Sequence, residues 1–199
     1  MNRGLHFVLC LLGLCAAAGS FAADEDKPLD WHALITVAQT RPTTDLRWGA
    51  GKAQILEHHH QFREMLSVPP RSQGAFLTED VADGACSFVV QASFDHSAAL
   101  SRLTLELPLT APPECGKKWL AALQALYGKP LRSGPVQDIV VDADTPIQTA
   151  WRTPTSCITS MYTVAGAPHP APFTVMFGDE RAGACGYDDE AAFANRRKH

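Results

Sequence analysis

The sequence predicts an α+β fold in which helices pack on one face of an antiparallel sheet. Three observations lead to this prediction. Apolar and polar residues alternate with a period of two in two separate groups of segments, a pattern typical of half-buried strands. An apolar stripe at helical spacing lies between the two groups. Cysteines recur at matched places in both groups, so we interpret the chain as a tandem α-β-β-β repeat.

The start of the chain has the three parts of a secretory signal peptide. A positive charge precedes the apolar stretch 7–14, and residues 20–22 fit the small-x-small cleavage rule. This stretch is shorter than the roughly 20 residues that span a bilayer, and no later segment is apolar enough. The mature chain is expected to begin near Ala23, in the periplasm and without a membrane span. A lipoprotein anchored at Cys15 is the competing interpretation, but Leu14 stands before it where a small residue is usual.

Charge and cysteine content narrow the function classes. Only one of the 17 Lys and Arg residues lies in the signal, so 16 remain against 21 Asp and Glu. This modest acidity argues against nucleic acid as a partner. The four mature cysteines form no CxxC pair, which argues against zinc ribbons and thioredoxin-like motifs. Two structural disulfides are the expectation for an oxidising compartment.

The first half of the repeat is expected to begin with a helix over residues 49–65, which carries apolar side chains at helical spacing. Three strands follow, over 75–81, 85–94 and 103–107. In the last two strands one face is more apolar than the other, so it should be the face that the helices cover. The side chains on that face include Phe88, Val90, Leu103 and Leu105.

The second half repeats this order. A helix is expected over 112–128, because prolines suit its first turn and Gly128 its end. Trp119 lies in the apolar stripe of this helix and is expected in the core. Strands are expected over 146–152, 156–164 and 173–178, and Trp151 belongs to the apolar face of the first of them.

The cysteines support the repeat and predict their own pairing. Cys86 and Cys157 lie 71 residues apart, and Cys115 and Cys185 lie 70 apart. The pairing that respects the repeat is Cys86–Cys115 and Cys157–Cys185, one of three possible. The chain then divides into a signal peptide 1–22, an N-terminal segment 23–45, a first half 46–110, a second half 111–187 and a C-terminal tail or short helix 188–199.

Two short motifs carry a resemblance. Leu46-Arg47-Trp48-Gly49 opens the first helix, and Tyr127-Gly128-Lys129-Pro130 ends the second, with Trp151 in the strand that follows. This order resembles small exported envelope proteins of the superfamily that holds the β-lactamase inhibitor protein and the small lipoprotein of the outer-membrane barrel-assembly machine. The resemblance covers residues 46–178. It implies the α-β-β-β fold and a role in protein binding, with no catalytic residues to carry over.

Residues 57–60 (Glu-His-His-His) have metal-ligand side chains. Glu57, His60 and Glu64 share a face of the expected helix, but a di-metal carboxylate bundle needs two such elements and two further glutamates. A solvated helix face is the simpler interpretation, with adventitious or true metal binding as alternatives. Three aspartates between 138 and 144 lack the spacing of a calcium loop. No nucleophile elbow is present, so we expect no catalytic, cofactor or metal site.

These observations favour a periplasmic protein-binding module, such as an inhibitor, an immunity protein or an envelope-assembly accessory. Its partner would be another envelope or secreted protein. The alternative is an envelope hydrolase that acts on cell-wall or similar substrates. The binding surface is expected on the sheet face opposite the helices, unless a helix from residue 188 covers it. The residues expected there are Arg102, Ile158, Tyr162 and Met176.

Overall fold

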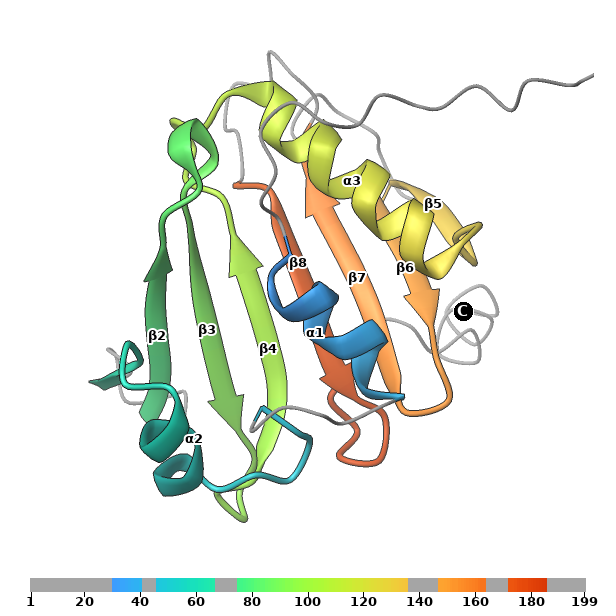
Figure 1. The fold of residues 1–199 in the computed structure, drawn as a ribbon. Helices are drawn as coiled ribbons and strands as arrows, with labels where there is room; N and C mark the ends of the chain where they lie inside the picture. Colours follow the sequence, from blue (N-terminus) through green and yellow to red (C-terminus); the bar gives the residue numbers. More distant parts are fainter. Residues whose placement is uncertain (1–29, 41–45, 67–74, 136–146, 164–171, 186–199) are drawn as a thin grey trace, which may run out of the picture.

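The computed structural model describes residues 30–40, 46–66, 75–135, 147–163 and 172–185. The expected signal peptide with Cys15, the aspartates between 138 and 144 and the tail 188–199 lie outside these residues. Within them, one eight-stranded antiparallel sheet is accompanied by three helices and a short 3-10 turn (Figure 1). The helical elements are α1 (His32–Gln39), α2 (Lys52–His58), η1 (Gly84–Cys86) and α3 (Pro113–Tyr127). The strands are β1 (Arg63–Leu66), β2 (Ala75–Val81), β3 (Phe88–Phe94), β4 (Leu100–Glu106), β5 (Arg132–Pro135), β6 (Ile147–Arg152), β7 (Ser156–Tyr162) and β8 (Thr174–Asp179).

The strand order across the sheet is β1-β2-β3-β4-β8-β7-β6-β5, and every neighbouring pair is antiparallel. The first half of the chain therefore supplies four neighbouring strands from one edge of the sheet to its middle, and the second half supplies the other four. The two halves meet where β4 pairs with β8, from Arg102 opposite Gly178 to Glu106 opposite Thr174. The mixed α+β class and the antiparallel sheet are as predicted, although each half supplies four strands to the sheet rather than three.

Helices α1 and α3 lie across the same face of the sheet (Figure 1). Helix α3 has the boundaries that its sequence predicts, since prolines open it and Gly128 ends it with a φ of +75°. Its buried side chains are Cys115, Trp119 and Leu123, which recur at helical spacing. This stripe faces the sheet, so the predicted covering layer is present over the second half.

The helix predicted over residues 49–65 is wrong in its second half. Helix α2 ends at His58, and His59 leaves the helical conformation with φ −118° and ψ 77°. Residues Arg63–Leu66 instead pair with β2, with Met65 opposite Phe76. The helical spacing of apolar side chains therefore extends past His58, where the helix itself ends. Tertiary pairing with a neighbouring strand overrode that weak local preference.

The sequence did not predict α1, which lies in the N-terminal segment. It packs against β7, and its buried side chains hold it there. They are Leu34, Ile35, Ala38 and Gln39, with Trp31 just before them.

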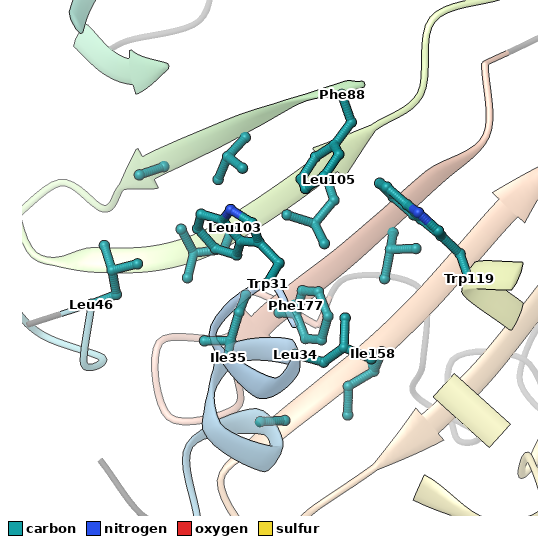
Figure 2. Packing of buried hydrophobic residues seen from close by; sticks show 14 of the residues in the cluster. Trp31, Leu34, Ile35, Leu46, Phe88, Leu103, Leu105, Trp119, Ile158 and Phe177 are labelled. Atoms are coloured by element: carbon teal, nitrogen blue, oxygen red, sulfur yellow. The ribbon is translucent and has the colours of Figure 1, made fainter. Parts of the chain in front are cut away.

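The apolar core lies between the sheet and the helices, and Figure 2 shows part of it. Trp119 and Trp151 are both buried there, which confirms the prediction made from their periodicity. The ring of Trp119 stands edge-on to Phe88 and to Phe173, with centroid distances of 4.9 and 5.8 Å. Trp151 and Phe177 are also among the largest fully buried side chains. Residues from both halves of the chain thus share one core.

Both disulfides have the predicted pairing. Cys86 is bonded to Cys115, with their Cα atoms 5.4 Å apart, and Cys157 is bonded to Cys185, with a Cα separation of 5.7 Å. The first bond joins η1 to α3, because Cys86 lies in the 3-10 turn before β3. The second joins β7 to the residues that follow β8. The first disulfide therefore links the first half of the chain to α3 of the second half, and the second disulfide lies within the second half.

The motif residues of the two resemblance segments make structural hydrogen bonds. The Trp48 indole donates to Ser156 Oγ at 2.8 Å, and that hydroxyl donates to the Ala38 carbonyl at 2.9 Å. The Trp151 indole donates to the carbonyl of Gly128 at 3.0 Å. The Tyr127 hydroxyl donates to the Leu34 carbonyl at 2.8 Å, and burial raises the pKa of Tyr127. These bonds connect α1 and the end of α3 to the second half of the sheet.

Glu79 gives a pH-dependent prediction. This buried carboxyl lies on the helix-covered face of β2, opposite Val90, and burial raises its pKa above the ordinary value. At a pH between the ordinary pKa of the unfolded chain and the raised pKa of the folded chain, folded Glu79 keeps a proton that the unfolded chain releases. The free energy of unfolding therefore falls as pH rises through that window. We expect Glu79→Gln to raise the melting temperature by a few degrees at pH 7.5 and to leave it nearly unchanged at pH 4.

The matched control for this measurement is Asp80→Asn on the next residue of the strand. Asp80 is exposed and forms an ion pair with Arg63. Removing an exposed pair of this kind changes stability by ~0–1 kcal/mol. A melting temperature of Glu79→Gln that is lower than wild type at pH 7.5 would contradict the assignment of Glu79 as a destabilising buried carboxylate.

Candidate partner-binding face

The structure separates the four residues that the sequence places on one binding surface. Ile158 pairs with Phe177 and with Trp151, and it is 0% exposed in the core. Tyr162 has the same parity in β7, so it lies on the same covered face, and its ring stacks on Phe173 at 5.8 Å. The placement of Ile158 and Tyr162 on the open face is therefore wrong. Arg102 and Met176 do lie on the face opposite the helices.

The error comes from aligning the two halves on their cysteines. Cys86 lies in η1, outside the strand ladder, whereas Cys157 lies inside β7 opposite Gly178. The spacing of 71 residues between them is odd, and side chains alternate faces with a period of two. An alignment with an odd offset therefore assigns every side chain of β7 to the wrong face of the sheet. The even offset of 70, which aligns Leu105 with Val175, gives the faces that the structure has.

The face opposite the helices remains accessible over β1–β4 and β8, and we call this surface the open face. Cross-strand pairing arranges its side chains in three rows that run across the strands. Row 1 consists of Met65, Phe76, Ser93 and Arg102. Row 2 consists of Arg63, Thr78, Gln91, Thr104 and Met176. Row 3 consists of Asp80, Val89, Glu106 and Thr174.

The open face ends beside β7. Within rows 1–3 every side chain is exposed or half-exposed, and Met65 is 49% exposed. On β7 and β6 the same face of the sheet is closed, because Gln148 is only 2% exposed and Ala150 and Thr159 are also buried. The accessible surface is therefore one-sided and is limited to the first half plus β8.

Uncharged polar side chains lie in the middle of the open face, and apolar and charged side chains surround them. Thr78, Gln91 and Thr104 are half-buried neighbours in row 2. The apolar side chains around them are Met65, Phe76, Val89 and Met176. Of the charged side chains, Arg63 and Asp80 form an ion pair with each other. An uncharged centre with aromatic and methionine side chains around it has the composition of a protein interface.

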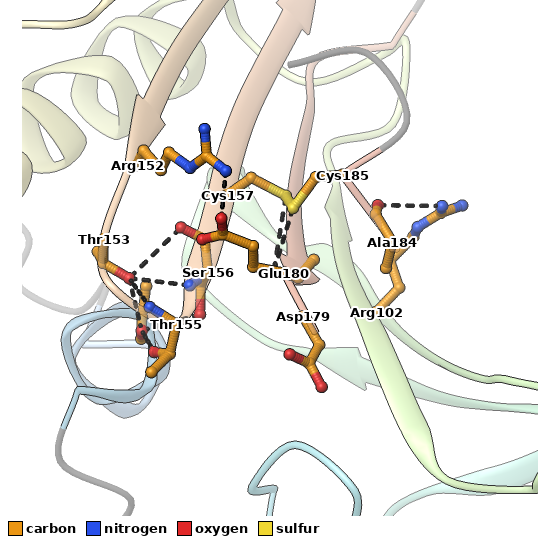
Figure 3. Close-up of a disulfide and its surroundings, with 12 residues drawn as sticks. Arg102, Arg152, Thr153, Thr155, Ser156, Cys157, Asp179, Glu180, Ala184 and Cys185 are labelled. Carbon is orange, nitrogen blue, oxygen red and sulfur yellow. Dashed lines mark hydrogen bonds and ion pairs between the residues drawn. A yellow bond between two sulfur atoms is a disulfide. The ribbon is translucent and has the colours of Figure 1, made fainter. Parts of the chain in front are cut away.

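Row 1 ends at a turn formed by residues 180–185, which we call the clasp (Figure 3). The clasp lies over the ends of four strands. Its Ala184 carbonyl accepts a hydrogen bond from Arg102 of β4, and its Glu180 forms an ion pair with Arg152 of β6. The disulfide between Cys157 and Cys185 holds it to β7. The disulfide of the clasp was predicted from the sequence, but its contacts with Arg102 and Arg152 were not, because they join residues that are far apart in the chain.

Gly178 lets the clasp approach β8. A Cβ atom at this position would lie 2.7 Å from the Ala184 carbonyl oxygen and 2.9 Å from the Sγ atom of Cys157. Real Cβ atoms essentially never come so close to other atoms, so any side chain here would push the clasp away. The glycine thus sets the position of the carbonyl group that Arg102 binds.

The residues with metal-ligand chemistry do not converge. Because α2 ends at His58, His60 and Glu64 do not share a helical face with Glu57, and that expectation is wrong. Glu64 lies in β1 and its Oε1 atom is 2.5 Å from Nζ of Lys52. Within the residues that the structure describes, no three His, Cys, Asp or Glu side chains are grouped as a metal site would need. No helix in the same residues is long and apolar enough to cross a bilayer.

No family model, no curated protein and no solved structure matches the chain. The resemblance to the exported envelope proteins therefore stays a prediction, and we infer the function from the fold and the open face.

Proposed function

We propose that the protein is an exported binding module of the periplasm, which binds another envelope or secreted protein through its open face. The observation that carries this proposal is the half-exposed, uncharged centre of the face with Met65, Phe76 and Met176 around it. Aromatic, methionine and arginine side chains are enriched at protein interfaces. Exposed apolar side chains that adjoin on one surface commonly mark such sites.

The two disulfides support export. Disulfides persist in oxidising compartments and are rare in the cytosol, where thiols are kept reduced. In this chain one pair joins η1 to α3 and the other joins the clasp to β7. They also leave all four cysteines of the mature chain without a free thiol. A bonded cysteine cannot act as a nucleophile, so the disulfides favour binding over thiol chemistry.

We propose further that the two halves are copies of one α-β-β-β unit. Three features support this interpretation: the mirrored strand order on either side of the β4–β8 pair, the matched cysteine spacings of 71 and 70 residues, and the even spacing that aligns Leu105 with Val175. Duplication of one unit would leave two equivalent sheet faces. Only the first of them is accessible, because the second is closed at Gln148 and Thr159.

Site-specific photo-crosslinking in host cells tests the binding role. A photo-reactive amino acid replaces Gln91 at the centre of the open face, and in a control variant it replaces Gln124 on the exposed side of α3. Both changes start from a glutamine, so the probes differ only in their place on the surface. We expect one predominant adduct with another exported protein from position 91 and none from position 124.

Two results would contradict the proposal. Equal adducts from both positions would show that contact is not specific to the open face. No adduct from position 91 would show that the open face is not a binding surface under those conditions of growth. An adduct of twice the protein's own mass would identify the partner as a second copy instead.

A further inference from the structure

We propose that Arg102 is the anchor of the open face and binds an acidic side chain of the partner protein. This inference rests on the proposed function, since it names the chemistry that the partner must present. Arg102 is exposed and lies on β4 in row 1, where the open face meets the clasp. A partner that covers the open face as far as β8 would therefore contact it.

Arg102 differs from the arginines near it in its pairing. Arg63 is paired with Asp80, and Arg152 with Glu180. Among the described residues Arg102 has no carboxylate partner, and its cross-strand neighbours are Ser93 and Gly178. Its guanidinium makes a single hydrogen bond there, from Nη2 to the Ala184 carbonyl at 3.3 Å.

That single bond positions the guanidinium without using up its binding capacity. The Ala184 carbonyl is held by the disulfide of the clasp and by its close approach to Gly178. Arginine has five N–H donors and binds carboxylates with two parallel hydrogen bonds. A side chain that is already held in place loses less conformational entropy on binding, which favours affinity.

The surroundings of Arg102 select the kind of partner. Met176 of β8 lies diagonally opposite it, and Phe76 lies two strands away in row 1, so apolar side chains share the open face with the cation. Arginine anchors within a patch that excludes water are common hot spots of protein interfaces. Asp80 and Glu106 in row 3 would repel an extended polyanion, so nucleic acid or an anionic membrane fits poorly. A single carboxylate on a folded protein fits both features.

The test uses the protein that is cross-linked through position 91, identified by mass spectrometry and purified. Its dissociation constant is measured with wild type, Arg102→Gln, Arg102→Lys and the control Arg47→Gln, which changes an exposed arginine outside rows 1–3. We expect Arg102→Gln to weaken binding by roughly 30-fold or more. Arg102→Lys should recover only part of the loss, since lysine cannot form the bidentate pair. The control should stay within about threefold of wild type, as for an exposed charge outside the interface.

Two further measurements distinguish direct pairing of Arg102 with a partner carboxylate from an indirect effect of the substitution on the fold. The affinity of wild type should fall as salt is added, and that of Arg102→Gln should fall less steeply. Replacing the contacted acidic residue of the partner with arginine should restore binding to Arg102→Glu. Binding of Arg102→Gln within twofold of wild type would overturn this inference and leave the open face as a binding surface. Failure to cross-link any protein through position 91 would overturn both proposals.

Discussion

Replacing Trp119 with alanine is expected to lower the free energy of unfolding by roughly 3–5 kcal/mol, as for other large core side chains. Trp119 is 1% exposed and lies between α3 and the sheet, where it contacts aromatic rings from β3 and from the residue before β8. Its removal would leave a cavity that the two halves of the core share. In a chain of this size the melting temperature should fall by about 10 °C.

The conservative variant Trp119→Phe is the control for this prediction. The indole Nε1 of Trp119 is buried and has no acceptor among the described residues. Phenylalanine keeps an aromatic ring and removes that unsatisfied donor, so we expect a loss of less than ~1.5 kcal/mol. A thermal melt of Trp119→Ala within two degrees of wild type would mean that the helix does not pack on the sheet as described.

Reduction of both disulfides is expected to unfold the protein or leave it marginally stable. The bonded cysteines are 29 and 28 residues apart in sequence. In the chain-entropy model a loop of that size stabilises the fold by about 3.5 kcal/mol. Losing two such contributions removes a large part of the ~5–15 kcal/mol that stabilises a typical domain. Urea denaturation with and without reductant measures the effect.

Single-pair variants separate the two bonds. Replacing Cys86 and Cys115 with alanine should loosen the contact of η1 with α3, whereas replacing Cys157 and Cys185 should free the clasp. In the second variant, amide hydrogen exchange should rise in residues 180–185 before it rises in β3 and β4. An unchanged urea midpoint after full reduction would contradict the stabilising role of both bonds.

Much of the sheet could be predicted from the sequence, because alternation marks strands whose two faces meet different surroundings. Strands β2, β3, β6 and β7 fall within the segments that were predicted, whereas β4 begins three residues before its segment and β8 ends one residue after its segment. Strands β1 and β5 were missed, since four residues are too few to show a period. Helix α1 was missed because its place depends on side chains that reach the distant second half, such as Ser156 with Ala38.

The binding surface was harder to predict than the strands that form it. Its residues depend on which face of each strand is covered, and one odd offset reversed that assignment for Ile158 and Tyr162. Arg102 and Met176 were placed on the open side, but the contact that positions Arg102 was not predictable. Ala184 lies 82 residues further along the chain, and only the folded disulfide brings its carbonyl within reach.

The shortest strands of the sheet are its two edges. β1 and β5 have four residues each, and every longer strand is paired on both sides. Arg63 and Glu64 lie on one edge strand, and the other ends at Pro135, which has no backbone N–H. Short edges with charges and proline resist the strand-to-strand association that leads to aggregates. The protein can therefore expose a broad sheet surface to a partner while giving other chains little backbone on which to grow a fibril.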